Sequence, residues 1–336
     1  MTKKRTLALI LVLLLLVALF QLDRESLINS IKQIPLWLAL LLFVLQIITQ
    51  LLINLQWYQI AKLCDAQLSF WNMLYANSKG AIVDSITPGV KIGGEVARTL
   101  TLSTFLRKTI PEPNKKAAII VAIQKLFSLS ALFSIMLFAV GYLIGEISFF
   151  KGNNLQFAVY GLLLAFLLLF TSIFIIPYQI KAYLQTKTFS KFSWLCKLRD
   201  FLLILIDCIL NIRKNKKVWM ALALLSSFIW FLFPAKMYIL TMYIYSDINW
   251  VYVGAITFVA YMIAMLPIFP GGLGGFEGTM LGLLVAVGLT TSDATVITIF
   301  FRFVTFWFVM FVSLDYVIIY KKFAKNFYNP IDTHMS

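Results

Sequence analysis

Long apolar stretches alternate along the chain with short polar segments, and this alternation gives the first prediction. The longest apolar stretches are residues 36–61, 126–145, 155–180 and 218–235. Each reaches or approaches the roughly 20 residues that an α-helix needs to cross a hydrocarbon core about 30 Å thick. Because lipid offers no partner for backbone N–H and C=O groups, we expect all four stretches to be helical.

Composition strengthens this interpretation. Of 336 residues, 61% are apolar and 13% are charged, and the mean hydropathy is +0.89. Water-soluble domains of this length do not have that balance, so the sequence predicts an all-α polytopic membrane protein. Residues 1–20 have the basic start and apolar run of a secretory signal, but no small-residue cleavage site follows Phe20. We therefore expect a retained first helix, with a cleaved signal as the alternative.

The basic residues predict which ends of the helices face the cytoplasm. The net charge is +15, and most Lys and Arg residues gather in four groups, at 3–5, 107–116, 181–217 and 321–325. The positive-inside rule places all four groups in the cytoplasm. Segments with few basic residues are predicted to face outward, namely 23–32, 146–154 and 247–250. Both termini are then cytoplasmic, and we expect six spanning helices.

The link at 181–217 holds nine Lys or Arg against two Asp, with an apolar stretch inside it. Between 190 and 211 the polar residues recur every three, four or seven positions, which places them on one helical face. This pattern predicts an amphipathic helix at the cytoplasmic surface. The alternative, a further span, would put two strongly basic segments on opposite sides of the membrane.

Residues 62–116 begin and end with basic residues that we place on the same side, so what lies between them must enter and return. The first limb, 70–87, contains Lys79 and Asp84, and the second limb, 96–106, is too short to span a bilayer. The segment therefore predicts a re-entrant helical hairpin with "TPGVKIGGE" at its tip.

A second hairpin is predicted at 247–292, around "LPIFPGGLGGFEGTML". In both hairpins a Pro-Gly pair opens a glycine-rich run that closes on a glutamate seven positions after the proline. The alternative here is two complete spans, because 250–269 and 273–289 are each long enough to cross.

The layout around the two tips is the same. A span precedes each hairpin and a helix with one charged residue follows it, Lys125 in the first case and Arg302 in the second. Both charges are predicted about 14 Å into the membrane, from opposite faces. This arrangement is an inverted-topology repeat, which many carriers use. The predicted domains are 1–35 (first helix and outer loop), 36–145 (first repeat, hairpin 62–116), 146–217 (connecting span and amphipathic helix), 218–320 (second repeat) and 321–336 (tail).

The tips carry the candidate binding residues. A helix that begins at a tip offers free backbone N–H groups and a partial positive charge, which favour an anion such as phosphate. Glycine permits a close approach of the backbone, and a carboxylate inside lipid needs a cation or a proton. The candidate translocation residues are Pro88, Gly89, Gly93, Gly94, Glu95, Arg98, Lys125, Pro270, Gly271, Gly272, Gly274, Gly275, Glu277 and Arg302.

Structural interpretations stand beside these assignments. Gly-Gly pairs in membrane helices also serve close helix packing, and the Lys125 side chain can extend towards the cytoplasm. Lys236 lies near the middle of its helix and is harder to explain in that way. The second predicted helix carries a polar stripe of Gln46, Gln50, Asn54 and Trp57. Hydrogen bonding between helices and a path for the substrate explain this stripe equally well.

The motifs "TPGVKIGGEVAR" and "PGGLGGFEG" resemble the paired Pro-Gly…Gly-Glu signatures of the lysylphosphatidylglycerol synthase transmembrane region, over roughly 36–320. The matching positions are Pro88, Gly89, Gly94, Glu95 and Arg98, then Pro270, Gly271, Gly272, Gly274 and Glu277. The segment 90–92 departs from the pattern, and sixteen residues follow Tyr320, so we expect a stand-alone module without the aminoacyl-transfer domain. The resemblance implies a flippase-like protein.

The expected function is therefore a non-enzymatic transporter for an anionic phospholipid or polyprenyl-phosphate head group. Membrane lipids are the expected partners, with proton coupling through Glu95 or Glu277, a homo-oligomer as a further option, and no nucleic acid. No metal or cofactor is expected, because Cys64, Cys196 and Cys208 lack metal-type spacing and the single His, His334, lies in the tail. The alternatives are a polyprenyl-diphosphate phosphatase-like enzyme and an accessory membrane scaffold.

Overall fold

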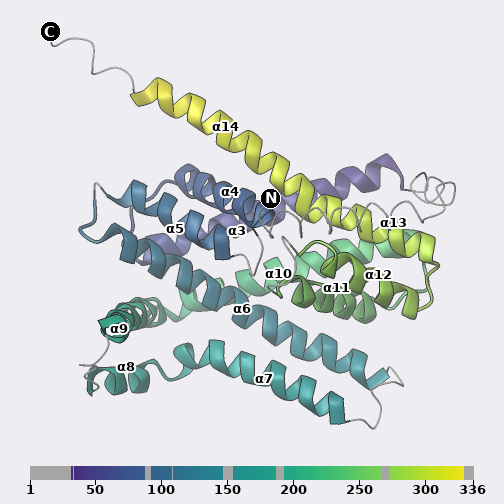
Figure 1. Ribbon diagram of the computed structural model, residues 1–336, viewed down its shortest axis with the longest axis horizontal. Helices are drawn as coiled ribbons and strands as arrows, with labels where there is room; N and C mark the ends of the chain where they lie inside the picture. Colours follow the sequence, from purple (N-terminus) through teal and green to yellow (C-terminus); the bar gives the residue numbers. More distant parts are fainter. Residues whose placement is uncertain are drawn as a thin grey trace, which may run out of the picture.

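The computed structural model describes residues 32, 34–87, 92–107, 109–146, 154–186, 193–266 and 272–328. Within these residues every regular element is helical, and none is a strand (Figure 1). The predicted all-α class is confirmed. The predicted first helix and the tail after Tyr328 lie outside the described residues.

The order of long and short helices repeats along the chain. The first half contains α3 (Leu36–Leu63), α4 (Phe70–Ile86), α5 (Ile92–Leu106) and α6 (Pro113–Glu146). The connecting part contains α7 (Asn154–Ile175), α8 (Pro177–Thr186) and α9 (Ser193–Lys214). The second half contains α10 (Lys216–Ile244), α11 (Trp250–Ala264), α12 (Gly275–Ala286), α13 (Thr291–Arg302), a π-helical turn (Phe303–Trp307) and α14 (Phe308–Tyr328). A long helix, two shorter helices and another long helical segment thus follow one another twice.

Four segments of the described chain are long and apolar enough to cross a membrane: Leu36–Leu63, Pro113–Ala139, Lys216–Ile244 and Thr291–Phe323. A fifth candidate is the pair formed by α7 and α8, which is bent by 73°. The protein is therefore a multi-pass integral membrane protein.

The prediction of one uninterrupted helix over 155–180 is wrong in one respect. The structure divides it at Ile176, and Pro177 begins α8. Proline lacks the N–H that would continue a helix, and its fixed φ suits the first position of a new one. The apolar character of this run extends past the break, which is why the hydropathy pattern does not reveal it.

The short helices pair as two hairpins, α4 with α5 and α11 with α12 (Figure 1). α11 has 15 residues and α12 has 12, so their lengths are about 22 and 18 Å, less than the hydrocarbon thickness. Each is shorter than the apolar segment that contains it. α12 begins only at Gly275, because Gly272 and Gly274 have φ angles of +74° and +84°. The alternative of two complete spans therefore does not match these two helices.

Neutral hydrogen bonds join the long helices in the interior. Gln56 of α3 donates to Ser226 of α10, and Gln124 of α6 donates to Gln56 at 3.1 Å. Asn54 of the predicted polar stripe donates to the Phe70 carbonyl at 3.2 Å and thereby ties α3 to the first hairpin. Interhelical bonding thus accounts for part of the stripe.

The predicted amphipathic helix is present as α9. Its buried face includes Ile206, Ile209 and Ile212, while Asp207 and Asn211 are exposed. The helix is anchored at its end by Arg213, whose guanidinium donates to the Phe174 carbonyl of α7 at 2.9 Å. α14 lies on the side of the fold opposite α9 (Figure 1). It packs against α4 of the first hairpin.

The glycines at the start of α12 yield a test of backbone strain. Gly274 and Gly278 both have open space where a Cβ would be placed, but only Gly274 has a positive φ. We expect Gly274→Ala to lower the free energy of unfolding by about 1–2 kcal/mol, because the left-handed conformation is unfavourable for L-residues. Gly278→Ala should raise the free energy of unfolding by up to about 1 kcal/mol, since alanine favours the helix. Unfolding by detergent titration, followed by tryptophan fluorescence, measures both values, and equal effects would contradict the assigned backbone.

Candidate functional site

Four charged side chains meet between the first hairpin and α6, and we call them the first charge cluster. They are Asp84 of α4, Glu95 and Arg98 of α5, and Lys125 of α6. Arg98 contacts Asp84 at 3.1 Å and Glu95 at 3.0 Å, while Lys125 Nζ lies 2.7 Å from Glu95 Oε1. The cluster holds two acids and two bases, so its formal charges cancel.

The helical geometry of α5 explains why Glu95 and Arg98 lie side by side in this cluster. Glu95 is in the first turn of α5, and Arg98 follows three positions later on the same face. The Arg98 guanidinium also lies over the Trp57 ring, 5.7 Å from its centroid. Trp57 is therefore, like Asn54, a member of the predicted polar stripe that reaches the hairpin. The side chains of Arg98 and Asp84 are 13% and 12% exposed, so the pair is largely withdrawn from the surroundings.

Glycines make room for these charges. A Cβ on Gly80 would lie 2.4 Å from Arg98 Nε, and a Cβ on Gly94 would lie 2.1 Å from Asp84 Oδ1. A Cβ on Gly93 would meet the Thr87 hydroxyl at 2.5 Å. The packing interpretation of Gly93 and Gly94 is therefore supported, and Gly80 joins them as a residue that the sequence pattern does not reveal.

The second charge cluster consists of Glu277 of α12 and Arg302 of α13. Glu277 Oε1 lies 2.8 Å from Arg302 Nε, and Glu277 Oε2 accepts a hydrogen bond from the Gly274 N–H at 2.7 Å. The Arg302 guanidinium lies 4.8 Å from the Phe276 ring centroid and 4.1 Å from that of Phe306. Such contacts with aromatic faces stabilise a cation that is withdrawn from water.

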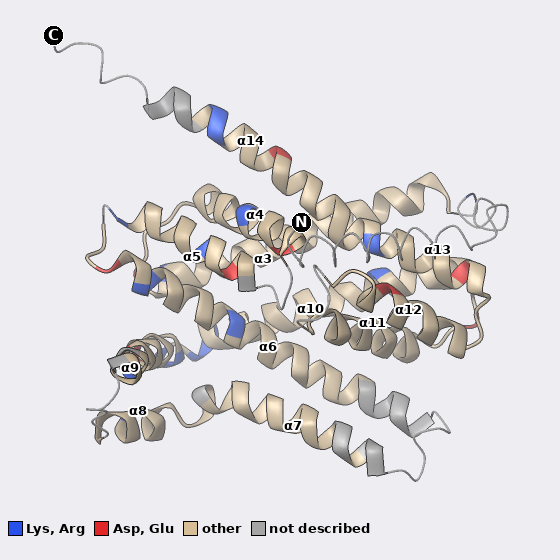
Figure 2. Cartoon of the chain, in the orientation of Figure 1, with Lys and Arg blue, Asp and Glu red and all other residues tan. Residues whose placement is uncertain are grey.

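The two clusters have the same construction. Each has a glutamate in the first turn of the second hairpin helix and a cation on the helix that follows. The distances between the paired atoms are 2.7 Å for Glu95 and Lys125 and 2.8 Å for Glu277 and Arg302. The predicted pairing of acids with cations at each tip is thus present. The charged residues beside α5 and beside α12 form two separate groups rather than one (Figure 2).

The protein's own carboxylates bind at the helix N-termini that the sequence suggests for an anion. Asp84 Oδ1 accepts from the Gly94 N–H at 3.0 Å in the first hairpin, and Glu277 accepts from Gly274 in the second. A carboxylate is favoured there by the free N–H groups and by the helix dipole. Asp84 is absent from the predicted site residues. Its position as an ionisable residue in an otherwise mostly apolar limb is the signal that could have identified it.

The other glycines and prolines predicted for the site fall into two groups, those that the structure describes and those outside the described residues. Gly272 and Gly274 adopt the left-handed backbone at the start of α12, and Gly275 is the first residue of that helix. The remaining glycine and proline candidates lie outside the described residues; these are Pro88, Gly89, Pro270 and Gly271. Within the described residues, no group of three His, Cys, Asp or Glu could hold a metal ion.

Lys236 of α10 is fully buried. Its ammonium group donates to Gln46 Oε1 and, at 3.0 Å, to the Thr49 hydroxyl, both on α3. It also lies 4.5 Å from the centroid of the Phe233 ring. It forms no ion pair with any described residue, so these contacts are all with neutral groups.

Comparisons with known proteins agree on the family. The sequence profile described as "Lysylphosphatidylglycerol synthase TM region" matches residues 6–313. A UPF0104 membrane protein of Methanocaldococcus jannaschii is 25% identical over 281 residues, which cover 80% of each chain. A UPF0104 membrane protein of Pyrococcus horikoshii is 25% identical over 324 residues, 91% of this chain and 93% of the relative.

The close packing at Gly94 can be tested with a matched pair of substitutions. We expect Gly94→Ala to lower the free energy of unfolding by about 1–3 kcal/mol, because the new Cβ displaces the Asp84 carboxylate. Gly161→Ala is the control, since a Cβ at that helical position meets nothing within 4 Å. Detergent-titration unfolding of both variants checks the prediction, and a stable Gly94→Ala protein would contradict the packing described here.

The Glu277–Arg302 pair is suited to a double-mutant cycle. Each single variant, Glu277→Gln or Arg302→Gln, should lower the free energy of unfolding by about 3 kcal/mol, because it leaves one charge buried without its partner. The double variant should be less destabilised than the sum of the two. The exposed Glu112–Lys115 pair, 59% and 52% exposed, provides the control cycle with a coupling of at most about 1 kcal/mol. Equal coupling energies in the two cycles would contradict a buried pair.

Proposed function

The chain belongs to the lysylphosphatidylglycerol synthase transmembrane-region family, and we propose that it is a flippase-like transporter for anionic lipid head groups. The lipid is a phospholipid or a polyprenyl phosphate, moved between the two leaflets. The observation that carries this proposal is the pair of equivalent charge clusters, each with a carboxylate at a helix N-terminus beside a cation. Both features bind phosphate in proteins.

The membrane arrangement in this proposal has six spanning helices and two re-entrant hairpins in an inverted-topology repeat. α3, the α4–α5 hairpin and α6 correspond to α10, the α11–α12 hairpin and α13–α14. Both termini and α9 lie on the cytoplasmic side of a prokaryotic inner membrane, as the positive-inside rule favours. The hairpin tips then approach from opposite faces, as in carriers that expose one site alternately to each side.

In this mechanism the head-group phosphate replaces a protein carboxylate. Arg98 and Arg302 are paired with acids in the described conformation, so an anionic head group must compete with those acids. A carboxylate that takes up a proton loses its attraction for the arginine and leaves it available to the phosphate. Proton uptake by Glu95 or Glu277 would in this way be coupled to lipid binding, and proton release would return the hairpin to its self-paired state.

The hydroxyl groups near the first tip support transport over phosphatase chemistry. Ser85 donates to the Ala81 carbonyl at 2.9 Å, and Thr87 donates to the Val83 carbonyl at 2.7 Å. A nucleophile needs a general base within hydrogen-bond reach. Both hydroxyls instead donate to a backbone carbonyl of their own helix, so neither is arranged as a nucleophile.

Leaflet exchange in liposomes tests the proposal. The wild-type protein, reconstituted with fluorescent phospholipids and a labelled polyprenyl phosphate, should accelerate exchange as measured by quenching from one side. Glu95→Gln and Glu277→Gln should each reduce the rate at least about tenfold, equivalent to 1.4 kcal/mol, because a head group bound at the cation is no longer displaced by a carboxylate. Glu112→Gln is the matched control, since Glu112 pairs with Lys115 at an exposed position.

Two results would contradict the transport proposal. One is the absence of accelerated exchange for every lipid in the panel. The other is unchanged exchange in both hairpin variants, which would favour a scaffold whose charged residues only hold the hairpins together. Phosphate release from a lipid diphosphate would instead support an enzyme.

A further inference from the structure

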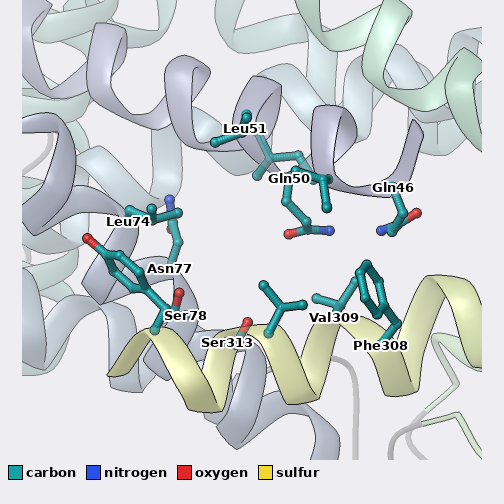
Figure 3. Close-up of a pocket in the computed structure, with 13 residues that line it drawn as sticks. Gln46, Gln50, Leu51, Leu74, Asn77, Ser78, Phe308, Val309 and Ser313 are labelled. Atoms are coloured by element: carbon teal, nitrogen blue, oxygen red, sulfur yellow. The ribbon is translucent and has the colours of Figure 1, made fainter. Parts of the chain in front are cut away.

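A groove of about 450 Å³ lies between α6, α7 and α10. α6 and α10 are candidate spans, and α7 belongs to the bent fifth candidate, so the groove lies in the part of the protein that crosses the membrane. Its lining among the described residues includes no member of either charge cluster. It is also separate from the smaller cavity of about 120 Å³ that α3, α4 and α14 line (Figure 3).

The surface of this groove is mostly apolar. Three of its hydroxyl groups already donate to backbone carbonyls of their own helices, those of Ser134, Thr171 and Ser227. Its rim includes Leu168 and Ile175, which are 54% and 60% exposed. A ligand of the groove therefore needs an apolar part, and it reaches the groove from the surrounding lipid.

The dimensions of the groove suit a single acyl chain. At roughly 30 Å³ for a group the size of a water molecule, the groove has room for on the order of fifteen such groups. An acyl chain that leaves the bilayer for an apolar groove exchanges one apolar environment for another. Selectivity for a particular lipid must then come from the protein groups beside its head group.

Two cationic side chains lie at one end of the groove. Phe174 and Ile175 of α7 line this end, and Arg213 Nη1 contacts their carbonyl oxygens at 2.9 and 3.5 Å. Arginine has five N–H groups, so the guanidinium can bind a phosphate at the same time. The second cation is Lys216, the first residue of α10.

The helical geometry of α10 places Lys216 in line with the groove. Residues at intervals of three and four positions share one face of a helix. Trp219, Ala223 and Ser227 line the groove at such intervals, and Lys216 precedes Trp219 by three positions. Lys217 is the next residue, about 100° further around the helix, so it belongs to a different face.

Both cations are available for an anion. Arg213 and Lys216 are exposed, and neither forms an ion pair with another residue that the structure describes. α9 has two acids, and both already have basic partners: Asp207 lies 2.5 Å from Lys181, and Asp200 lies 2.9 Å from Arg199. The end of the groove thus combines an apolar channel with positive charge that the protein does not neutralise.

We propose that this groove binds an anionic phospholipid, with one acyl chain between α6, α7 and α10 and the phosphate at Arg213 and Lys216. The lipid belongs to the leaflet on the α9 side, which is cytoplasmic in the proposed membrane arrangement. Basic pockets between membrane-spanning helices on that side bind anionic head groups. The lipid stays bound beside the helices and is distinct from a lipid that crosses at the charge clusters, so the site does not depend on the transport function.

Quenching of Trp219 fluorescence by brominated acyl chains tests the proposal, because bromine quenches tryptophan at contact and Trp219 lines the groove. The full-length protein is placed in phosphatidylcholine nanodiscs with increasing fractions of brominated phosphatidylglycerol or brominated phosphatidylcholine. The difference between the wild type and Trp219→Phe reports Trp219 alone. We expect half-maximal quenching at about a fivefold lower fraction of phosphatidylglycerol, since basic residues near the membrane surface favour an anionic head group.

Two matched pairs of variants locate the head group and the chain. Lys216→Gln should reduce the preference for phosphatidylglycerol to about twofold or less, whereas Lys217→Gln, with the same change of charge on another face, should keep it. Ala223→Phe fills the groove and should remove most of the Trp219 quenching by either lipid. Leu224→Phe, at the adjacent position that is 64% exposed, should leave the quenching unchanged.

Three results would overturn the proposal. Equal quenching by the two lipids at equal fractions would show that Trp219 faces bulk lipid without a specific site. No quenching by either lipid would show that protein, such as the predicted first helix, covers the groove. A preference that survives both Lys216→Gln and Arg213→Gln would remove the phosphate from these cations, and this outcome can be read even if Ala223→Phe fails to fold. Failure of leaflet exchange would leave the site standing.

Discussion

The rest of this structure depends on the requirement that a charge withdrawn from water must have a partner. Each hairpin places a glutamate in the first turn of its second helix, and each following helix supplies the cation. The pair therefore satisfies its own electrostatic requirement and also holds a short hairpin against a long helix. Because the hairpin helices are short, these contacts and the glycine-mediated packing have a large share in fixing their position.

Neutral polar groups in the same interior have a different role, which is to join the long helices. The bonds of Gln56, Gln124 and Ser226 join three long helices without any charge to neutralise. Such bonds are specific in geometry and insensitive to proton uptake. The charge clusters at the hairpins are instead held by ion pairs, so neutral hydrogen bonds join the long helices and charged contacts hold the hairpins. Lys236 belongs to neither class, since it is an ionisable side chain whose hydrogen bonds are with the neutral residues Gln46 and Thr49.

The sequence predicts the parts of this fold that follow from local patterns. Apolar length identifies α3 and α10, and basic segments identify the connections. The Pro-Gly to Glu spacing identifies both hairpins and the acids that pair with Lys125 and Arg302. What the sequence does not reveal depends on side-chain direction across helices. Gly80 matters only because Arg98 occupies the space beside it, and a cavity lined by Gln50, Asn77 and Ser313 lies where α14 crosses α3 and α4. No periodicity within one helix contains that information.

The π-helical turn at Phe303–Trp307 divides one long segment into two parts with different neighbours. The part before it carries Arg302 to the second hairpin, and the part after it packs against α4 of the first. A single π-helical turn inside an α-helix is rare and is frequently found at functional sites. The segment is thus one continuous helical element that touches both hairpins, so it ties the two halves of the protein together directly.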